Sequence, residues 1–140
     1  MNREELENLA RKIAVGLGPG DGLFLTGELG VGKSVFARAV LRALGVEGPI
    51  PSPSFIVDAI YVTGDLEIHH IDLYRLRGDP GELEFYGIGD ALTSDALVLV
   101  EWAERLPEEV LRTGTRVHIS FTDDPDEREV MLNGEPVAGN

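Results

Sequence analysis

Apolar residues recur at helical spacing near the start of the chain. Asn2 suits the N-cap of a helix, and the glycine- and proline-rich residues 18–22 would end it. The apolar face of this predicted helix consists of Leu6, Leu9, Ala10, Ile13, Ala14 and Leu17. Leu23-Phe24-Leu25 has the pattern of a short buried strand, and a second helical pattern runs from Val35 to Leu44, where Gly45 offers a stop. This part of the chain therefore predicts a helix, a strand and a second helix.

An extended run and a turn follow in the middle of the chain. After a Gly/Pro-rich connection from Gly45 to Pro53, we expect an extended strand from Phe55 to Val62. Thr63-Gly64-Asp65 favours a hairpin turn, which would pair this strand with residues Leu66 to Asp72 as an antiparallel neighbour. Prolines and glycines break residues 73–94 into short helical turns.

Further strands are predicted toward the C-terminus. Leu97-Val98-Leu99-Val100 is an apolar run that ends in Glu101, and this profile is typical of a strand buried on both faces. Residues Arg116 to Phe121 and Arg128 to Leu132 predict a terminal strand pair, and Asn133-Gly134 favours a tight turn after it.

The segment between the first strand and the second helix fits the phosphate-binding pattern Gly-x4-Gly-Lys-Ser/Thr. It reads Gly27-Glu28-Leu29-Gly30-Val31-Gly32-Lys33-Ser34, and Val35 follows. Such a loop points backbone N–H groups at phosphate oxygens, and the next helix adds its positive N-terminal end. Lys33 would reach the terminal phosphates, and the Ser34 hydroxyl would supply a ligand to Mg²⁺. We therefore expect residues 27–35 to bind a nucleoside triphosphate; the alternative is a glycine-rich turn with a solvated lysine.

A phosphate loop implies a doubly wound α/β sheet with its ligand crevice at the carboxyl ends of the strands. We expect a P-loop NTPase-like α/β fold with a mostly parallel sheet, one antiparallel hairpin and helices on both faces. Asp72 and Glu101 each follow a predicted strand, so either could hold Mg²⁺ opposite Ser34 or orient an attacking water. The alternative for each is a solvated acid that ends a strand, and the sequence does not say which acid has which role.

Composition bounds the size and class of the protein. At 140 residues and 43% hydrophobic composition, we expect a single domain over residues 1–140. With no apolar run of about eighteen residues and a charged N-terminal segment, we expect neither a membrane span nor a secretory signal, and a cytoplasmic location. The absence of cysteine excludes disulfides and thiolate zinc sites. The net charge of −13 repels nucleic-acid backbones, so we expect no stable direct nucleic-acid binding by this chain alone.

Taken together, the motifs resemble the TsaE family, small bacterial ATPases required for the threonylcarbamoyladenosine modification of tRNA. The resemblance spans most of the chain and keeps the family's order and spacing. Its elements are the loop Gly27 to Ser34, then Ser52-Pro53-Ser54-Phe55, then His70-Ile71-Asp72-Leu73-Tyr74-Arg75-Leu76, and then Val100-Glu101-Trp102. The family usually has threonine where Ser34 and Ser54 stand, and both residues keep a hydroxyl.

The resemblance implies ATP and Mg²⁺ as ligands and the TsaB and TsaD proteins as partners. It matches Lys33 and Ser34 to phosphate and magnesium ligands, Asp72 to the acid of the second nucleotide motif, and Glu101 with Trp102 to a pair linked to hydrolysis. It also makes residues Ser52 to Phe55 a mobile, nucleotide-sensing loop. Trp102 fits the pattern of a core or interface aromatic equally well. The side chain of Glu28 is expected to face solvent or a partner, and His69 and His70 to be hydrogen-bonded structural residues.

Three functions share this site. The first is an ATPase in which Lys33, Asp72 and Glu101 are catalytic, and it is expected to be slow without partners because no arginine finger is evident; Arg38, Arg42, Arg75 and Arg77 are candidates. The second is a small-molecule kinase. The third is a nucleotide-controlled assembly switch in which hydrolysis only resets the interaction. A GTPase is disfavoured because the sequence has no Asn-Lys-x-Asp element.

Overall fold

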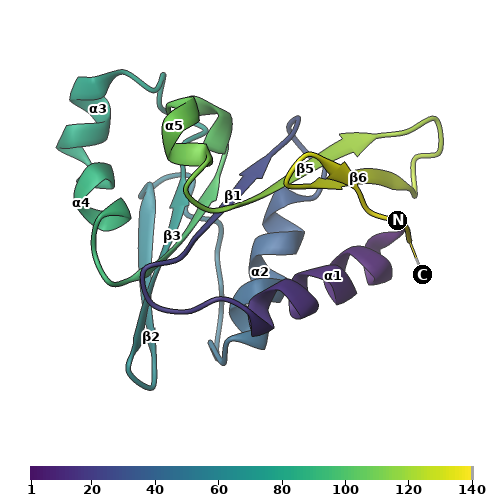
Figure 1. Ribbon diagram of the computed structural model, residues 1–140, viewed down its shortest axis with the longest axis horizontal. Helices are drawn as coiled ribbons and strands as arrows, with labels where there is room; N and C mark the ends of the chain where they lie inside the picture. The colour runs from purple at the N-terminus through teal and green to yellow at the C-terminus, as the bar shows by residue number, and fades with distance from the viewer. Residues whose placement is uncertain (140) are drawn as a thin grey trace.

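A computed structural model of the protein describes residues 1–139, and within them one sheet of seven strands has the order β2-β3-β4-β1-β5-β6-β7 (Figure 1). The strands are β1 (Gly22–Thr26), β2 (Asp58–Thr63), β3 (Leu66–Asp72), β4 (Leu97–Glu101), β5 (Thr115–Phe121), β6 (Arg128–Leu132) and β7 (Glu135–Pro136). The helices are α1 (Arg3–Val15), α2 (Lys33–Ala43), α3 (Pro80–Phe85), α4 (Ile88–Leu92), α5 (Glu108–Leu111) and the 3-10 helix η1 (Ala103–Arg105). In this part of the chain, none of the helices has the length and apolar character needed to span a membrane.

The central strands β3, β4, β1 and β5 are parallel, and antiparallel strands flank them on both sides. The β2–β3 hairpin adds one edge, and β6 and β7 continue the sheet beyond β5. Parallel pairing brings the carboxyl ends of β3, β4 and β1 to the same edge of the sheet. The expectation of a mostly parallel sheet with an antiparallel hairpin is confirmed.

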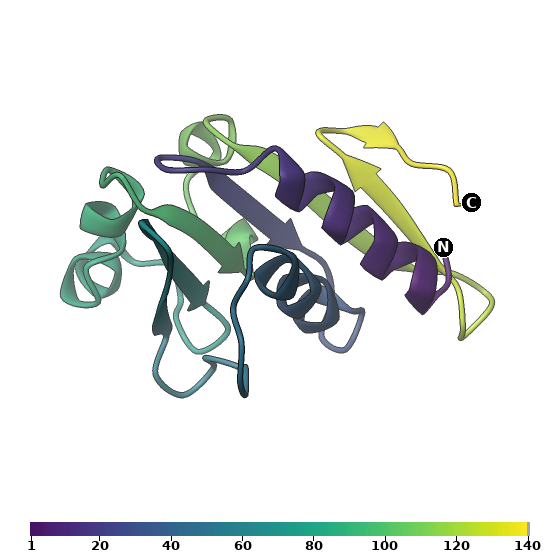
Figure 2. The same ribbon diagram turned by 90° about the horizontal axis from the view of Figure 1, so that it is seen from below.

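Helices cover both faces of this sheet. Asn2 caps α1 and forms a capping box with Glu5, and the apolar side of α1 packs with α2 against one face (Figure 2). The other face carries Phe24, Val98 and Val100, which pack with residues of α4, η1 and α5. The alternation of side chains along β1 explains this division, since Leu23 and Leu25 point to the first face and Phe24 to the second.

The predicted strand from Phe55 to Val62 begins later in the structure, at Asp58. The backbone N–H groups of Ile56 and Val57 both donate to the Pro53 carbonyl, which closes a turn instead of an extended run. Val57 has a φ of 70°, so the chain changes direction there before it enters β2. The prediction was wrong for residues 55–57 because apolar residues in this turn have the composition of a strand.

Charged and titratable side chains are buried at one place in the described residues. Lys33, His70, Asp72 and Glu101 are each at most 4% exposed, and all come from the carboxyl-end edge of the sheet or from the start of α2. Burying charge without partners costs several kcal/mol, so such a group points to paired contacts and to a site.

Candidate functional site

The loop between β1 and α2 passes close to β5. Gly27 has a φ of 140°, and a Cβ atom there would lie 2.4 Å from the carbonyl oxygen of Ile119. Only glycine fits this approach. The N–H of Gly27 donates to the Glu104 carboxylate at 3.1 Å, which holds the base of the loop against η1.

Lys33 folds back onto its own loop. Its ammonium donates to the carbonyl oxygens of Gly27 and of Glu28, the latter at 2.8 Å, and it lies 4.0 Å from the centre of the Trp102 ring. Burial lowers the pKa of Lys33 below its usual value, while the carboxylates of Glu104, Glu101, Asp72 and Glu28 act in the opposite direction. The lysine is therefore a desolvated cation whose present partners are neutral carbonyls.

Ser34, Glu101 and His70 form a continuous hydrogen-bonded chain. The Ser34 hydroxyl donates to Glu101 Oε1 at 2.8 Å, and His70 Nε2 lies 2.6 Å from Glu101 Oε2. A carboxylate only accepts, so we assign the Nε2–H tautomer to His70; its Nδ1 is buried and has no partner among the described residues. Because β4 lies beside β1, Glu101 reaches the start of α2 through Oε1, while His70 of β3 holds Oε2.

Asp72 occupies the same edge one strand further out. It is the register partner of Glu101 across β3 and β4, but its carboxylate accepts from the Ser54 hydroxyl at 2.8 Å and from the Tyr74 N–H at 2.9 Å. The strand order thus separates two acids that the sequence left equivalent. Glu101 contacts Ser34, and Asp72 contacts the loop that contains Ser54.

Trp102 is half-buried and has a left-handed backbone conformation with a φ of 59°. The ammonium of Lys33 and the guanidinium of Arg105 lie 4.0 and 5.3 Å from the centre of its ring, and the centre of the Tyr74 ring is 5.2 Å away. A bulky residue at positive φ is uncommon and occurs preferentially at functional sites. Trp102 therefore lies between the site and the core: it contacts the loop lysine and also packs against the apolar cluster on the second face of the sheet.

A pocket of about 400 Å³ opens over these side chains. We call it the phosphate pocket. Its walls contain the following residues proposed from the sequence: Leu29, Gly30, Gly32, Lys33, Ser34, Val35, Ser54, Asp72, Glu101 and Trp102. Three further loop residues proposed from the sequence lie outside the pocket wall. Gly27 and Glu28 accept hydrogen bonds from Lys33 through their carbonyls, and the side chain of Val31 is buried.

The oxygen donors in the phosphate pocket fit Mg²⁺. Ser34 offers a hydroxyl, and Glu101 and Asp72 offer carboxylates, which are the hard ligands that Mg²⁺ prefers. No cluster of three or more His, Asp or Glu residues that could hold a metal occurs within residues 1–139. Such a donor set suits an ion that is bound through one or two carboxylates together with substrate phosphates and water.

Several residues of the site carried no sequence signal for their contacts. Glu104 and Arg105 follow Trp102 in η1, and Arg105 Nη1 donates to the carbonyls of Leu73, Tyr74 and Leu76, which holds the loop after β3. Of the four arginine-finger candidates, the pocket wall contains Arg75, whose guanidinium lies 4.2 Å from the centre of the Phe55 ring. These contacts join segments that are distant in sequence, so no local pattern indicates them.

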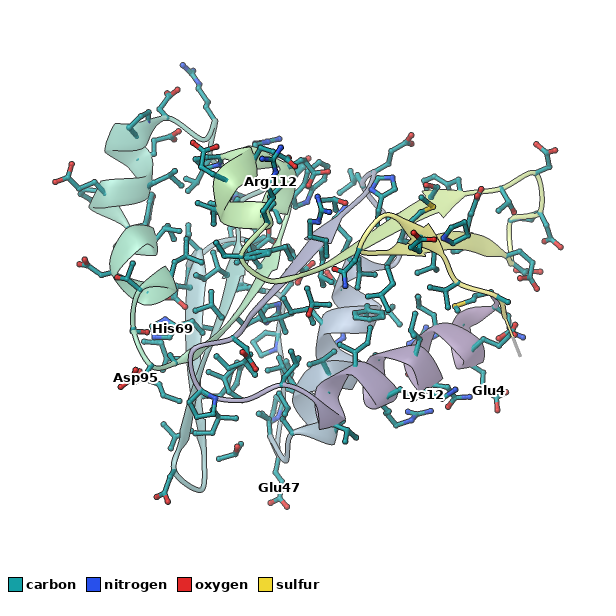
Figure 3. The ribbon with its side chains drawn as sticks, in the orientation of Figure 1. Glu4, Lys12, Glu47, His69, Asp95 and Arg112 are labelled. Carbon is teal, nitrogen blue, oxygen red and sulfur yellow. The ribbon has the colours of Figure 1, made fainter. Side chains whose placement is uncertain are left out.

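His69 and His70 lie on opposite faces of β3. His70 joins the buried chain described above, whereas His69 Nδ1 lies 2.7 Å from Asp58 Oδ2 on the face that α4 covers (Figure 3). Both are hydrogen-bonded, as the sequence predicted. The structure adds that His70 contacts a carboxylate of the phosphate pocket.

The comparisons with known proteins agree over nearly the whole chain. The model of the family described as "Threonylcarbamoyl adenosine biosynthesis protein TsaE" matches residues 1–130. Two proteins named tRNA threonylcarbamoyladenosine biosynthesis protein TsaE are similar to it. That of Bacillus subtilis is 32% identical over 132 residues, covering 94% of this chain and 81% of the relative. The protein of Streptomyces coelicolor is 36% identical over 134 residues, covering 92% of this chain and 90% of the relative.

A solved structure is similar as well. The crystal structure of Bacillus subtilis YdiB superposes with a TM-score of 0.70 at 32% identity, covering 94% of this chain and 80% of that one. The family match, the level of identity and the shared fold lead to one conclusion: the chain belongs to the TsaE family of tRNA threonylcarbamoyladenosine biosynthesis proteins.

Proposed function

We propose that this protein binds and hydrolyses ATP with Mg²⁺ in the threonylcarbamoyladenosine modification of tRNA, and that it acts through the partner proteins TsaB and TsaD. The observation that carries the proposal is the convergence of Lys33, Ser34 and Glu101 on one pocket at the carboxyl ends of parallel strands. Membership of the TsaE family supports a role in tRNA threonylcarbamoyladenosine biosynthesis, and the side chains of the pocket support ATP with Mg²⁺ as the ligand.

Phosphate oxygens are the natural partners of Lys33 in this setting. The ammonium is buried and bonded to neutral carbonyls, so an anion would supply the negative charge that its present hydrogen-bond partners lack. Within the described residues, no side chain caps the first turn of α2, whose positive end faces the same loop. Both features favour a polyphosphate over a neutral ligand.

The two acids would have different roles. Ser34 and Glu101 would hold Mg²⁺, and the ion would neutralise charge that develops on the transferred phosphoryl group. His70 holds the second oxygen of Glu101 and fixes the orientation of that carboxylate. Asp72 would orient the attacking water once the hydroxyl of Ser54 leaves its carboxylate.

The loop that contains Ser54 favours a second function, a nucleotide-controlled assembly switch. Ser54 is tied to Asp72, while the neighbouring Phe55 and Ile56 are 81% and 62% exposed. A nucleotide that displaced Ser54 would move two exposed apolar side chains, and such a change could control contact with a partner protein.

Calorimetric titration tests ligand binding. We expect ATP to bind with Mg²⁺ and to bind much more weakly to Lys33→Ala, because the ammonium in the loop is lost. Lys12→Ala is a matched control, since Lys12 lies on α1 outside the phosphate pocket. If Lys33→Ala and wild type bound ATP equally well, the proposed site would be wrong.

Hydrolysis assays with and without TsaB and TsaD test the activity and the partners. We expect slow release of free phosphate that accelerates when the partners are added. Equal rates with and without them would remove the partners from the proposal, and phosphate on an added metabolite would indicate a kinase. Glu101→Ala separates the two functions, because tRNA modification that survives the loss of hydrolysis would make the protein a binding switch.

A further inference from the structure

Strand β2 forms one edge of the sheet, and among the described residues it pairs only with β3 (Figure 1). Thr63 and Leu66 flank the two turn residues of the hairpin, so they form the hydrogen-bonded pair that closes it. Hydrogen-bonded and non-hydrogen-bonded pairs alternate along antiparallel strands. The backbone N–H and C=O groups of Val62 and Ile60 therefore point away from β3, toward the open side of the edge.

The side chains at these two positions are apolar. Ile60 and Val62 are 56% and 68% exposed, and because one residue separates them they lie on the same face of the strand. The exposed side of an edge strand is usually blunted by charged side chains. An apolar pair beside unpaired backbone groups is a surface that a further strand can cover.

The two edges of the sheet are protected to different degrees. Short strands, proline, lysine and bulges keep edge strands from pairing. At one edge, β7 has two residues, and one of them is Pro136. At the other edge, β2 has six residues without proline, lysine or arginine, and its register with β3 runs without a bulge from Asp58 to Thr63. The β2 edge therefore lacks the features that protect the β7 edge.

The charge around β2 has one sign. The sequence from residue 43 to residue 74 contains no lysine or arginine. Glu67 is the register partner of Val62 and its side chain is 54% exposed, and Asp65 is exposed in the hairpin turn. A strand that is added along β2 would therefore lie close to carboxylates, which favour a positively charged segment.

A second copy of this chain is the competing occupant. Its β2 would bring the same acids, and each copy has a net charge of −13. Like charges on neighbouring strands destabilise their pairing. Charge complementarity therefore favours a basic segment of a different protein.

We propose that β2 accepts an extended, basic segment of a partner protein as an additional strand of the sheet. In this mode of recognition, main-chain hydrogen bonds supply affinity and alternate side chains supply specificity. The segment would place apolar side chains over Ile60 and Val62, and lysine or arginine beside Asp65 and Glu67. The inference rests on the proposed function, which includes partner proteins, and it adds the place and the mode of contact.

The start of β2 is also joined to the phosphate pocket. The turn that contains Ser54 leads directly into β2, and the backbone N–H of Asp72 donates to the Val57 carbonyl at 2.8 Å. The carboxylate of Asp72 accepts from Ser54. The docking edge therefore begins beside the segment that a nucleotide would move, so the partner is tested in the presence of Mg²⁺–ATP.

Hydrogen exchange resolved to single residues tests the contact, with the purified TsaB–TsaD pair as the partner. We expect the amides of Ile60 and Val62 to exchange rapidly in the free protein and about tenfold more slowly in the complex, because each gains a hydrogen-bond acceptor. The amide of Tyr61 points to β3 and is an internal control whose exchange should stay slow in both states. If the pair bound while Ile60 and Val62 kept their free exchange rates, the inference would be overturned.

Calorimetric titration of the TsaB–TsaD pair into two variants tests the backbone contact. Ile60→Pro removes an outward N–H at a position where an edge strand tolerates proline. Ile60→Ala is its matched control, because it removes the apolar side chain and keeps the N–H. We expect Ile60→Pro to bind the pair about three- to tenfold more weakly than Ile60→Ala, the effect of one hydrogen bond, and to bind Mg²⁺–ATP like wild type. Equal binding of the pair by both variants would refute the added strand.

A second pair of variants tests the charge of the partner segment. Val62→Lys and Val62→Glu both replace the apolar side chain with a charged one, and we expect Val62→Lys to bind the pair about threefold more weakly than Val62→Glu, with a smaller difference at high salt. Equal binding, or tighter binding by Val62→Lys, would refute a basic segment. Self-association of wild type that Ile60→Pro abolishes in sedimentation would identify a second copy as the occupant instead. If wild type did not bind the pair at all, this inference and the partners of the proposed function would both be wrong, whereas binding of Mg²⁺–ATP would still support the phosphate site.

Discussion

The buried contact between His70 and Glu101 should make a large contribution to stability. His70 Nε2 lies 2.6 Å from Glu101 Oε2, and the two side chains are 1% and 2% exposed. In His70→Ala we expect the free energy of unfolding to fall by about 2–4 kcal/mol. A hydrogen bond to a charged group contributes about 1.5–3 kcal/mol, and the missing imidazole leaves a cavity beside the carboxylate.

Urea unfolding followed by far-UV circular dichroism measures this free energy. His69→Ala is a matched control, because His69 lies next along β3, points to the other face and pairs with Asp58, where the two side chains are 13% and 20% exposed. We expect this control to lose about 1 kcal/mol or less, since water can replace part of the lost contact.

A double-mutant cycle isolates the contact itself. In a Glu101→Gln background, removal of His70 should cost at least about 1 kcal/mol less than in wild type, because the buried acceptor is no longer charged. Two results would refute the reasoning: equal losses in His70→Ala and His69→Ala, or costs that add within about 0.5 kcal/mol in the cycle.

Three further predictions concern the loop and its lysine. The ammonium of Lys33 lies 4.0 Å from the ring centre of Trp102, the only tryptophan, so binding of Mg²⁺–ATP should change the intrinsic fluorescence, and this change should be absent in Lys33→Ala. Burial lowers the pKa of Lys33, and bound phosphate should raise it. ATP binding should therefore take up protons between the lowered pKa and the ordinary lysine pKa of 10.5, and this uptake should vanish well below that pH range. Calorimetry in two buffers of different ionisation enthalpy measures the uptake, and an uptake that is constant with pH would contradict the prediction. Gly27→Ala should lower the free energy of unfolding by more than about 2 kcal/mol, because the new Cβ would lie 2.4 Å from a backbone oxygen. In Gly30→Ala the new Cβ would have nothing within 4 Å, so this variant should lose only the roughly 1–2 kcal/mol of positive-φ strain. Equal losses of the two variants in urea unfolding would argue against the close approach at Gly27.

The loop and its flanking elements were predictable because they are contiguous in sequence. The strand before Gly27 and the helix that contains Lys33 each have a local apolar period, and the glycine spacing between them is specific. The turn at residues 55–57 was not predictable in the same way. Its apolar side chains imitate a strand, and the hydrogen bonds to Pro53 that bend the backbone leave no compositional signal.

By itself, the sequence determined the strands and helices around the phosphate loop, the pattern of that loop and two acids at strand ends. Only the tertiary structure decided what each acid contacts, because strand order is a property of the whole sheet: β4 lies beside β1 and brings Glu101 to Ser34, while β3 lies one strand further and leaves Asp72 with Ser54. The contacts of Arg128 likewise exist only in three dimensions, where its guanidinium donates to the Val31 carbonyl of the loop and to the Pro125 carbonyl of the β5–β6 turn. The local spacing of apolar residues indicates whether a segment is a helix or a strand. Contacts between distant segments depend on how these elements pack, and no local pattern encodes that packing.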